Sequence, residues 1–162
     1  MPRVFLGLGS NVDPEANLQM AVRELRRRFG DPKLSPVYSS APLGFDGADF
    51  LNLVAAFDTD LEPGDLLRQF EELHGLAGRV RGADPYMSRP LDIDLLMYGD
   101  RVDPGPPLRL PREDVLLYSF VLRPLADIAP DFVHPLTGKT IARHWQEFDQ
   151  VVHPLTLVDL AL

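Results

Sequence analysis

The sequence has 162 residues, of which 45% are hydrophobic and 25% are charged, and it contains no cysteine. This length and composition predict one globular domain over residues 1–162, and the lack of cysteine excludes disulfides and thiolate metal sites. The net charge of −8 argues against general nucleic-acid binding, which needs a basic face. The first apolar run is too short for a signal segment or a membrane span, so we expect a cytoplasmic protein with no membrane association.

Apolar patterns predict strands at residues 3–9, 34–40, 51–58 and 91–98. Two helices separate them. One begins at Pro14 with Asp13 as its N-cap, and the other begins at Pro63. Helical spacing indicates two buried stripes, one made of Leu18, Val22, Leu25 and Phe29, and the other of Leu66, Phe70, Leu73 and Ala77.

The order strand, helix, strand, strand, helix, strand is the signature of a ferredoxin-like α+β sandwich. We therefore expect a βαββαβ core with helices on one face of an antiparallel sheet. The rest of the chain predicts a looser C-terminal extension, with a short strand near residues 108–110 and a helix at about residues 119–127. Its last residues, "VVHPLTLVDLAL", are apolar and are expected to pack on the body or on a partner.

The segment "RPLDIDLL" places two carboxylates one residue apart inside an apolar strand. Because side chains alternate along a strand, Asp92 and Asp94 should share one face, opposite Leu91, Ile93, Leu95 and Met97. Two carboxylates at this spacing suit magnesium, which is usually held by one or two carboxylates together with substrate phosphates. The alternatives are a solvated strand face for the acids and plain ion pairs for the arginines just upstream.

A group of aromatic residues surrounds an amide at "GFDGADFLN". Phe45, Phe50 and Asn52 lie there, and Phe120 lies in the expected C-terminal helix. An amide beside aromatic rings could hydrogen-bond the edge of a flat heterocycle stacked between them. The alternative is that the phenylalanines belong to the core and that Asn52 caps a strand end.

Several landmarks run in order over most of the chain: "GLGSN", "APLG", "FLN", "GRVR", "RPLDIDLLMYG", "LPRED" and "RPLADIAP". In this order they resemble the 6-hydroxymethyl-7,8-dihydropterin pyrophosphokinase (HPPK) family of the folate pathway. The R-x-x-D-[LIV]-D-[LIV]-[LIV] core is specific to that family. The resemblance implies a ferredoxin-like core and transfer of the pyrophosphoryl group of ATP to the pterin hydroxymethyl group, with release of AMP.

The resemblance also implies roles for individual residues. The catalytic set would be Arg81, Arg89, Asp92 and Asp94, with the two aspartates holding two magnesium ions. The pterin would contact Ser40, Leu43, Phe50, Asn52 and Phe120. On the ATP side the resemblance implies Arg79, Arg81 and Arg89, and we add Tyr86, Arg109 and Arg112 as further candidates. The expected partners are these small-molecule substrates, and the expected state is a monomer, with an oligomer as the alternative. Closing loops are expected at residues 44–49 and 78–88.

The chain departs from the family pattern on the expected ATP side. Tyr86-Met87-Ser88 replaces Trp-Gly-Pro before the signature arginine, and Arg112 replaces a histidine. Tyr118 stands where a basic residue is expected, and His74 stands where a helix glutamate is expected. Arg109 and Arg112 are the candidates to supply the missing positive charge.

Two alternatives to an active enzyme follow from these departures. One is a non-catalytic paralogue that binds a pterin or a nucleotide, and the other is an unrelated interaction module of ferredoxin-like fold. Retention of Arg89, Asp92 and Asp94 together argues against the second. Magnesium-dependent formation of AMP from ATP, in the presence of the reduced pterin, separates the first from an active enzyme.

Overall fold

The computed structural model describes residues 1–78 and 88–162. The elements along this part of the chain are β1 (Arg3–Ser10), α1 (Pro14–Phe29), β2 (Lys33–Leu34), β3 (Val37–Ser40), β4 (Phe50–Asp58), α2 (Pro63–Leu76), β5 (Asp92–Tyr98), α3 (Asp114–Leu117), α4 (Ser119–Ile128), α5 (Ile141–Glu147) and β6 (Thr156–Val158).

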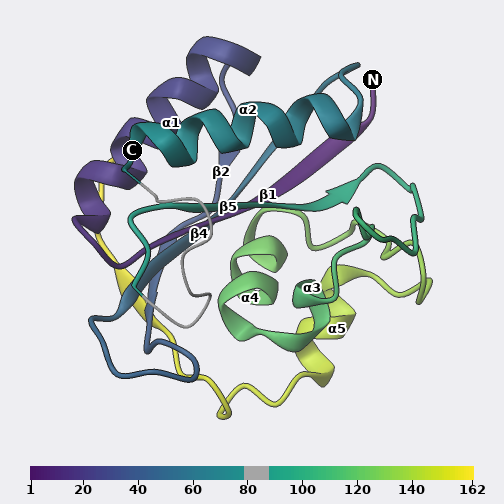
Figure 1. Ribbon diagram of the computed structural model, residues 1–162. Coiled ribbons are helices and arrows are strands. Elements are labelled where there is room, and N and C mark those ends of the chain that lie inside the picture. Colours follow the sequence, from purple (N-terminus) through teal and green to yellow (C-terminus); the bar gives the residue numbers. More distant parts are fainter. Residues whose placement is uncertain (79–87) are drawn as a thin grey trace.

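The described strands form one antiparallel sheet in the order β5-β1-β4-β3-β6, and β2 pairs with β4 outside this path (Figure 1). The predicted mixture of helices with an antiparallel sheet is therefore confirmed. The strand expected at residues 34–40 is two short strands, interrupted at Ser35 and Pro36. Proline has no N–H to donate to a ladder, and the hydroxyl of Ser35 instead accepts a hydrogen bond from the Val54 main chain at 2.9 Å.

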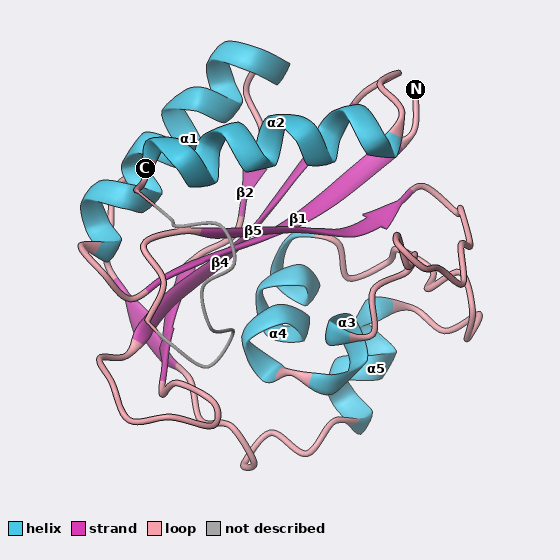
Figure 2. Cartoon of the chain, in the orientation of Figure 1, coloured by secondary structure: helices cyan, strands magenta, loops and turns pink. Residues whose placement is uncertain are grey.

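Helices cover both faces of the sheet: the two predicted core helices share one face, as expected, and the helices that follow β5 (Asp92–Tyr98) cover the other. Helices α1 and α2 lie over one face, and α3, α4 and α5 lie over the other (Figure 2). The physical reason is that β1 and β4 are apolar on both sides. Leu6 and Leu53 belong to the core beneath α1 and α2, whereas Phe5 and Val54 belong to the core that includes Leu122 of α4.

Helix α1 begins at Pro14, as predicted, and Leu18, Val22 and Leu25 are fully buried. Asp13 occupies the N-cap position, as predicted, but its side chain makes no cap hydrogen bond and its backbone is left-handed, with φ of 43°. A capping residue usually has an extended backbone, from which its side chain can accept from the first N–H groups of the helix. The left-handed backbone of Asp13 does not provide that geometry.

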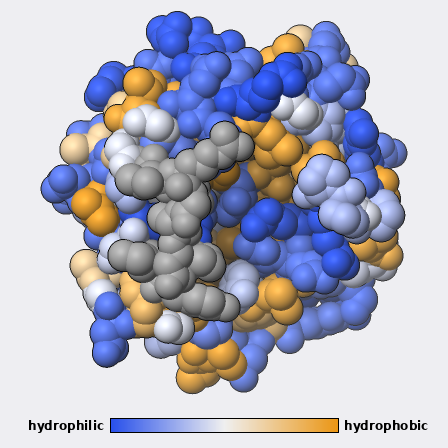
Figure 3. All heavy atoms as spheres, viewed as in Figure 1, coloured by the Kyte–Doolittle hydropathy of each residue, from blue (hydrophilic) through white to orange (hydrophobic). Residues whose placement is uncertain are grey.

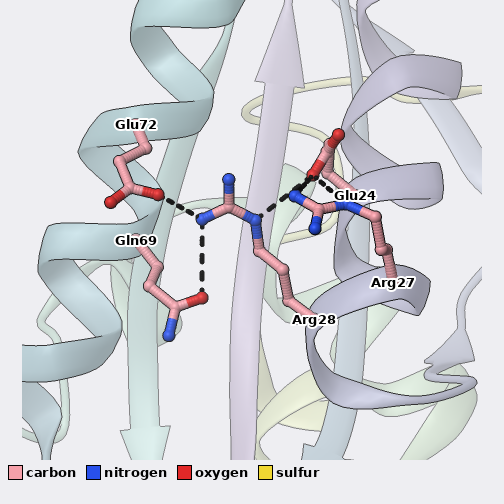
Figure 4. A network of polar contacts seen from close by, with 5 residues as sticks. All are labelled: Glu24, Arg27, Arg28, Gln69 and Glu72. Atoms are coloured by element: carbon pink, nitrogen blue, oxygen red, sulfur yellow. Dashed lines mark hydrogen bonds and ion pairs between the residues drawn. The ribbon is translucent and has the colours of Figure 1, made fainter.

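Arg28 joins the two helices of one layer (Figure 4). Its guanidinium contacts Glu24 of its own helix at 3.2 Å and Glu72 of α2 at 2.5 Å. The side chain of Arg28 is only 13% exposed, so its stem packs between the helices while its head remains paired. The network thus links α1 to α2 above the sheet.

The C-terminal residues pack on the body of the protein. Strand β6 pairs with β3, and Leu160 and Leu162 pack against the core beneath α1. The strand expected at residues 108–110 is a single bridge between Asp103 and Leu110, because a proline-rich turn precedes it. The helix expected at residues 119–127 is confirmed as α4, while α5 had no prediction.

The surface seen from the side of Figure 1 is mostly hydrophilic, with apolar residues in separate patches (Figure 3). No helix in the described part of the chain combines the length and the apolarity that crossing a membrane requires.

Candidate active site

A cleft of about 330 Å³ lies between the sheet and helix α4. Eight of the predicted site residues line it: Ser40, Leu43, Phe50, Asn52, Arg89, Asp92, Asp94 and Phe120. These residues come from β3, β4, β5, α4 and two connecting segments. The structure thus brings the whole predicted pterin set together with the aspartate pair and the signature arginine.

The floor of the cleft is a strip of strand β1 that has no side chains. Gly7 and Gly9 both line the cleft, and they lie on the face of β1 that also carries Phe5. A methyl group added at Gly9 would lie 3.3 Å from Oδ1 of Asn52, which is tighter than ordinary van der Waals contact. The two glycines therefore allow a ligand to approach the middle of the sheet.

The two aspartates share one face of β5, as predicted, but Met97 does not lie opposite them. The ladder between β1 and β5 shifts after Leu95, which opposes Leu6, so that Met97 opposes Phe5. This irregularity has the effect of a β-bulge, which turns the following side chains to the other face. Met97 consequently packs with Leu96 on the α4 side, and the prediction for Met97 is wrong.

Each aspartate has a basic neighbour at a distance longer than a normal hydrogen bond. Arg89 Nη1 lies 3.4 Å from Asp92 Oδ1, and Arg112 Nη2 lies 3.7 Å from Asp94 Oδ1. Both carboxylates still line the cleft, with 28% and 29% of their side chains exposed, so they remain accessible to a ligand. Burial, followed by repulsion from Asp92, raises the pKa of Asp94 to about 7, although Arg112 and Arg89 oppose this shift.

His74 contacts the aspartate strand from helix α2. Its Nε2 accepts a hydrogen bond from the main-chain N–H of Ile93 at 2.9 Å, and its Nδ1 lies 3.0 Å from Glu71. Ile93 is the residue between the two aspartates. The expected glutamate would also supply an acceptor at this position, so the departure at His74 retains a hydrogen-bond acceptor for β5.

Asn52 is held in one orientation at the back of the cleft. Its Nδ2 donates to the carbonyl of Tyr38 at 3.2 Å and to the hydroxyl of Ser40 at 2.9 Å. Because a carbonyl can only accept, the amide nitrogen must be on that side. Oδ1 is therefore directed toward Gly9 as an acceptor. The alternative reading of Asn52 as a simple strand-end cap does not account for its place in the cleft.

Aromatic rings border the cleft on two sides. Phe50 and Phe45 meet edge to face, with ring centroids 6.4 Å apart, and Phe120 stacks on Tyr118 at 5.1 Å. All four line the cleft, so Phe50 and Phe120 are wall residues and not simply core. Tyr118, in place of the expected basic residue, extends the aromatic wall.

The remaining predicted site residues, all on the expected ATP side, are not among the described residues that line the cleft. Arg79, Arg81 and Tyr86 lie outside the described residues. Arg109 pairs with Glu113 at 2.8 Å, and Arg112 approaches both Asp94 and Asp114. Neither arginine is among the described residues that line the cleft.

Sequence reasoning missed Asp114, which also lines the cleft and lies 3.4 Å from Arg112. The "LPRED" landmark contains it, but nothing in its local pattern distinguishes it from a surface acid. It also missed Asn11, although "GLGSN" contains that residue.

The chemistry of the aspartate pair fits a hard cation that takes some of its ligands from the protein and the others from a substrate. Within the described residues, no three His, Asp or Glu side chains converge to hold a metal ion by themselves. Magnesium does not need three, because one or two carboxylates commonly hold it together with phosphate oxygens. The two accessible carboxylates of Asp92 and Asp94 meet that requirement.

Comparisons with known proteins agree on one family. The model of the 7,8-dihydro-6-hydroxymethylpterin-pyrophosphokinase (HPPK) family matches residues 5–130. A 2-amino-4-hydroxy-6-hydroxymethyldihydropteridine pyrophosphokinase of Pseudomonas aeruginosa is 40% identical over 138 residues, covering 82% of this chain and 84% of the relative. A protein of the same name from Synechocystis sp. is 36% identical over 147 residues, covering 89% and 75%.

The fold is similar to that of the solved Plasmodium falciparum HPPK-DHPS, with a TM-score of 0.71 at 14% sequence identity. The match covers 90% of this chain and 44% of that protein, so this chain spans less than half of its length.

These findings place the chain in the class of the pterin pyrophosphokinases. Within this class, the chain belongs to the HPPK family.

Proposed function

We propose that this protein transfers the pyrophosphoryl group of ATP to the hydroxymethyl group of 6-hydroxymethyl-7,8-dihydropterin, as the names of its relatives state for them. The observation that carries this proposal is the content of one cleft. Asp92, Asp94 and Arg89 lie in the same space as Phe50, Asn52 and Phe120, so a triphosphate site and a flat-ring site are adjacent.

The pterin ring would lie between Phe50 and Phe120, over the side-chain-free strip of β1. Oδ1 of Asn52 would accept from N–H groups on the ring edge, because its own Nδ2 is already used by Tyr38 and Ser40. Leu43 would close the apolar side of the cleft. This arrangement directs the hydroxymethyl group away from Asn52, toward the phosphate end.

At the phosphate end, Asp92 and Asp94 would hold two Mg²⁺ ions, and these ions would neutralise the charge of the ATP phosphates. Arg89 lies on the same side and would pair with phosphate oxygens. The attacking hydroxymethyl oxygen forms a bond to the β-phosphorus, the bond from that phosphorus to the AMP oxygen breaks, and the hydroxyl proton is released. Positioning and charge neutralisation supply most of the rate in this kind of reaction.

Arg112 and Arg109 remain our candidates for the positive charge that the departures from the family pattern remove. Arg112 is the better placed, because it already approaches Asp94 and Asp114. Arg79, Arg81 and Tyr86 keep their proposed roles toward ATP on the basis of the family resemblance alone. We expect a monomeric cytoplasmic enzyme with one domain.

The strand order β5-β1-β4-β3 supports a ferredoxin-like core. The two central strands are β1 and β4. Strand β1 lies between β4 and β5, which α2 joins, and β4 lies between β1 and β3, with α1 on the connection between them, as the βαββαβ pattern requires. The residues after β5 would then be the C-terminal extension, which adds α3, α4, α5 and β6.

The test is product formation. ATP, Mg²⁺ and the reduced pterin should give AMP and pterin diphosphate in equal amounts, and omitting the pterin or the metal should stop AMP formation. Asp94→Asn should show no turnover but should still bind the pterin, because Asn52 and the rings are separate from the aspartates. Binding of both substrates by the wild type without AMP formation would identify a non-catalytic paralogue instead.

A further inference from the structure

Asn11 is a buried polar residue immediately after β1, with only 5% of its surface exposed. Its Oδ1 accepts a hydrogen bond from the main-chain N–H of Arg89 at 2.7 Å. Its Nδ2 donates to the carbonyl of Ala48 at 3.1 Å and to the hydroxyl of Ser88 at 3.2 Å. Its own main-chain N–H donates to the carbonyl of Arg89 at 3.0 Å.

The chemistry of these partners fixes the orientation of the Asn11 amide. The N–H of Arg89 can only donate, and the carbonyl of Ala48 can only accept. Rotating the amide by 180° would therefore create a mismatch with both partners. The side chain can link these segments in only one way.

The segments that Asn11 joins carry opposite ends of the proposed site. Residues 41–49 include Leu43 and Phe45, which line the aromatic side of the cleft, whereas Arg89 lines the phosphate side. The segments also approach each other directly. A methyl group added at Gly47 would lie 3.1 Å from the Phe45 ring and 3.4 Å from the hydroxyl of Ser88.

We propose that Asn11 is a positioning residue, which fixes the main chain of Arg89 relative to residues 41–49 and so sets the distance between the two substrates. This inference rests on the proposed function of the cleft. Asn11 is not among the described residues that line the cleft, so it acts through Arg89 and through Ala48. Since displacement of reacting groups by about 1 Å can cost about a hundredfold in rate, loss of this link acts on turnover.

The link has two halves: Oδ1 of Asn11 accepts from Arg89, and its Nδ2 donates to Ala48 and Ser88. Two variants of Asn11 test these halves separately. Asn11→Ala removes both halves. Asn11→Asp keeps an acceptor for the N–H of Arg89 but cannot donate to Ala48 or Ser88. Asn17→Ala is the matched control, because the Asn17 side chain also donates to a main-chain carbonyl, that of Val12, at 2.6 Å, but it lies on the exposed start of α1.

The experiment measures kcat, the KM of each substrate and the unfolding midpoint of the four proteins. Asn11→Ala should lower kcat about tenfold to a hundredfold at a temperature where the protein remains folded. Asn11→Asp should raise the KM of the pterin more than that of ATP, because the Ala48 carbonyl loses its donor, while the N–H of Arg89 keeps its acceptor and the hydroxyl of Ser88 can itself donate to the new carboxylate. Asn17→Ala should match the wild type.

A second measurement distinguishes this inference from the proposed function. The affinity of the reduced pterin is measured with and without a non-hydrolysable ATP analogue and Mg²⁺, and Asn11→Ala should reduce the coupling between the two ligands. If wild-type protein is active and Asn11→Ala matches Asn17→Ala in kcat, both KM values and coupling, the inference is wrong. If Asn11→Ala does not fold, the KM pattern of Asn11→Asp decides. Wild-type protein without turnover would contradict the proposed function itself.

Discussion

The Nε2 atom of His74 lies 2.9 Å from the main-chain nitrogen of Ile93, the residue between Asp92 and Asp94. Among the described strands, β5 lies at the edge of the sheet, and helix α2 supplies the acceptor for this N–H. Because the N–H can only donate, Nε2 carries no proton and Nδ1 carries the hydrogen that faces Glu71.

His74→Leu should therefore destabilise the protein, because it leaves a buried N–H without this acceptor. The expected loss is about 1–3 kcal/mol in the free energy of unfolding. His74→Gln retains a side-chain acceptor and should lose less. Denaturant unfolding of the three proteins measures the effect, and equal losses in both variants would show that the hydrogen bond to Ile93 contributes nothing.

The raised pKa of Asp94 predicts how the metal-free protein responds to pH. The folded state keeps a proton on Asp94 up to about pH 7, whereas the unfolded state releases it near the ordinary value of 3.8. Between these values the folded state binds more protons, so this group makes stability fall as pH rises from about 4 to about 7. Asp94→Asn removes the effect and should raise the unfolding midpoint at pH 8 more than at pH 4.

The measurement is thermal unfolding of both proteins in a chelator at the two pH values. In a domain of this size, each 1 kcal/mol corresponds to about 2–4 °C. A gain of the same size at pH 4 and pH 8 would show that ionisation of Asp94 is not the cause.

Gly9→Ala should weaken pterin binding about tenfold, because the added methyl group lies 3.3 Å from Oδ1 of Asn52 and enters the floor of the cleft. Gly64→Ala is the control, since a methyl group there meets nothing within 4 Å. Titration with the reduced pterin measures the affinities, and unfolding midpoints show that both variants are folded. Unchanged affinity in Gly9→Ala would place the ring elsewhere.

The sequence predicts the core well where local periodicity decides the structure. Both helices begin at the predicted prolines, and the alternation along β5 is correct through Leu95. It fails at Met97 because the shift in the ladder is set by the pairing of β1 with β5, which leaves no mark in the local pattern.

The site was predicted from a mixture of chemistry and family resemblance. Asp92 and Asp94 were found from their place in an apolar strand. Ser40 and Leu43 came from the resemblance alone. Asn11 was missed because its partners, Ala48 and Ser88, are 37 and 77 residues away in sequence. Such a link exists only after folding, and neither its residue type nor its spacing indicates it.

The glycine strip of β1 also bears on inhibition. A flat inhibitor placed over Gly7 and Gly9 would contact peptide groups, and no side-chain substitution can take those atoms away. Resistance at these positions would require adding a side chain, and the same added atoms would exclude the natural substrate. Compounds that rely on this part of the cleft should therefore be harder to escape by mutation than compounds that depend on its aromatic walls.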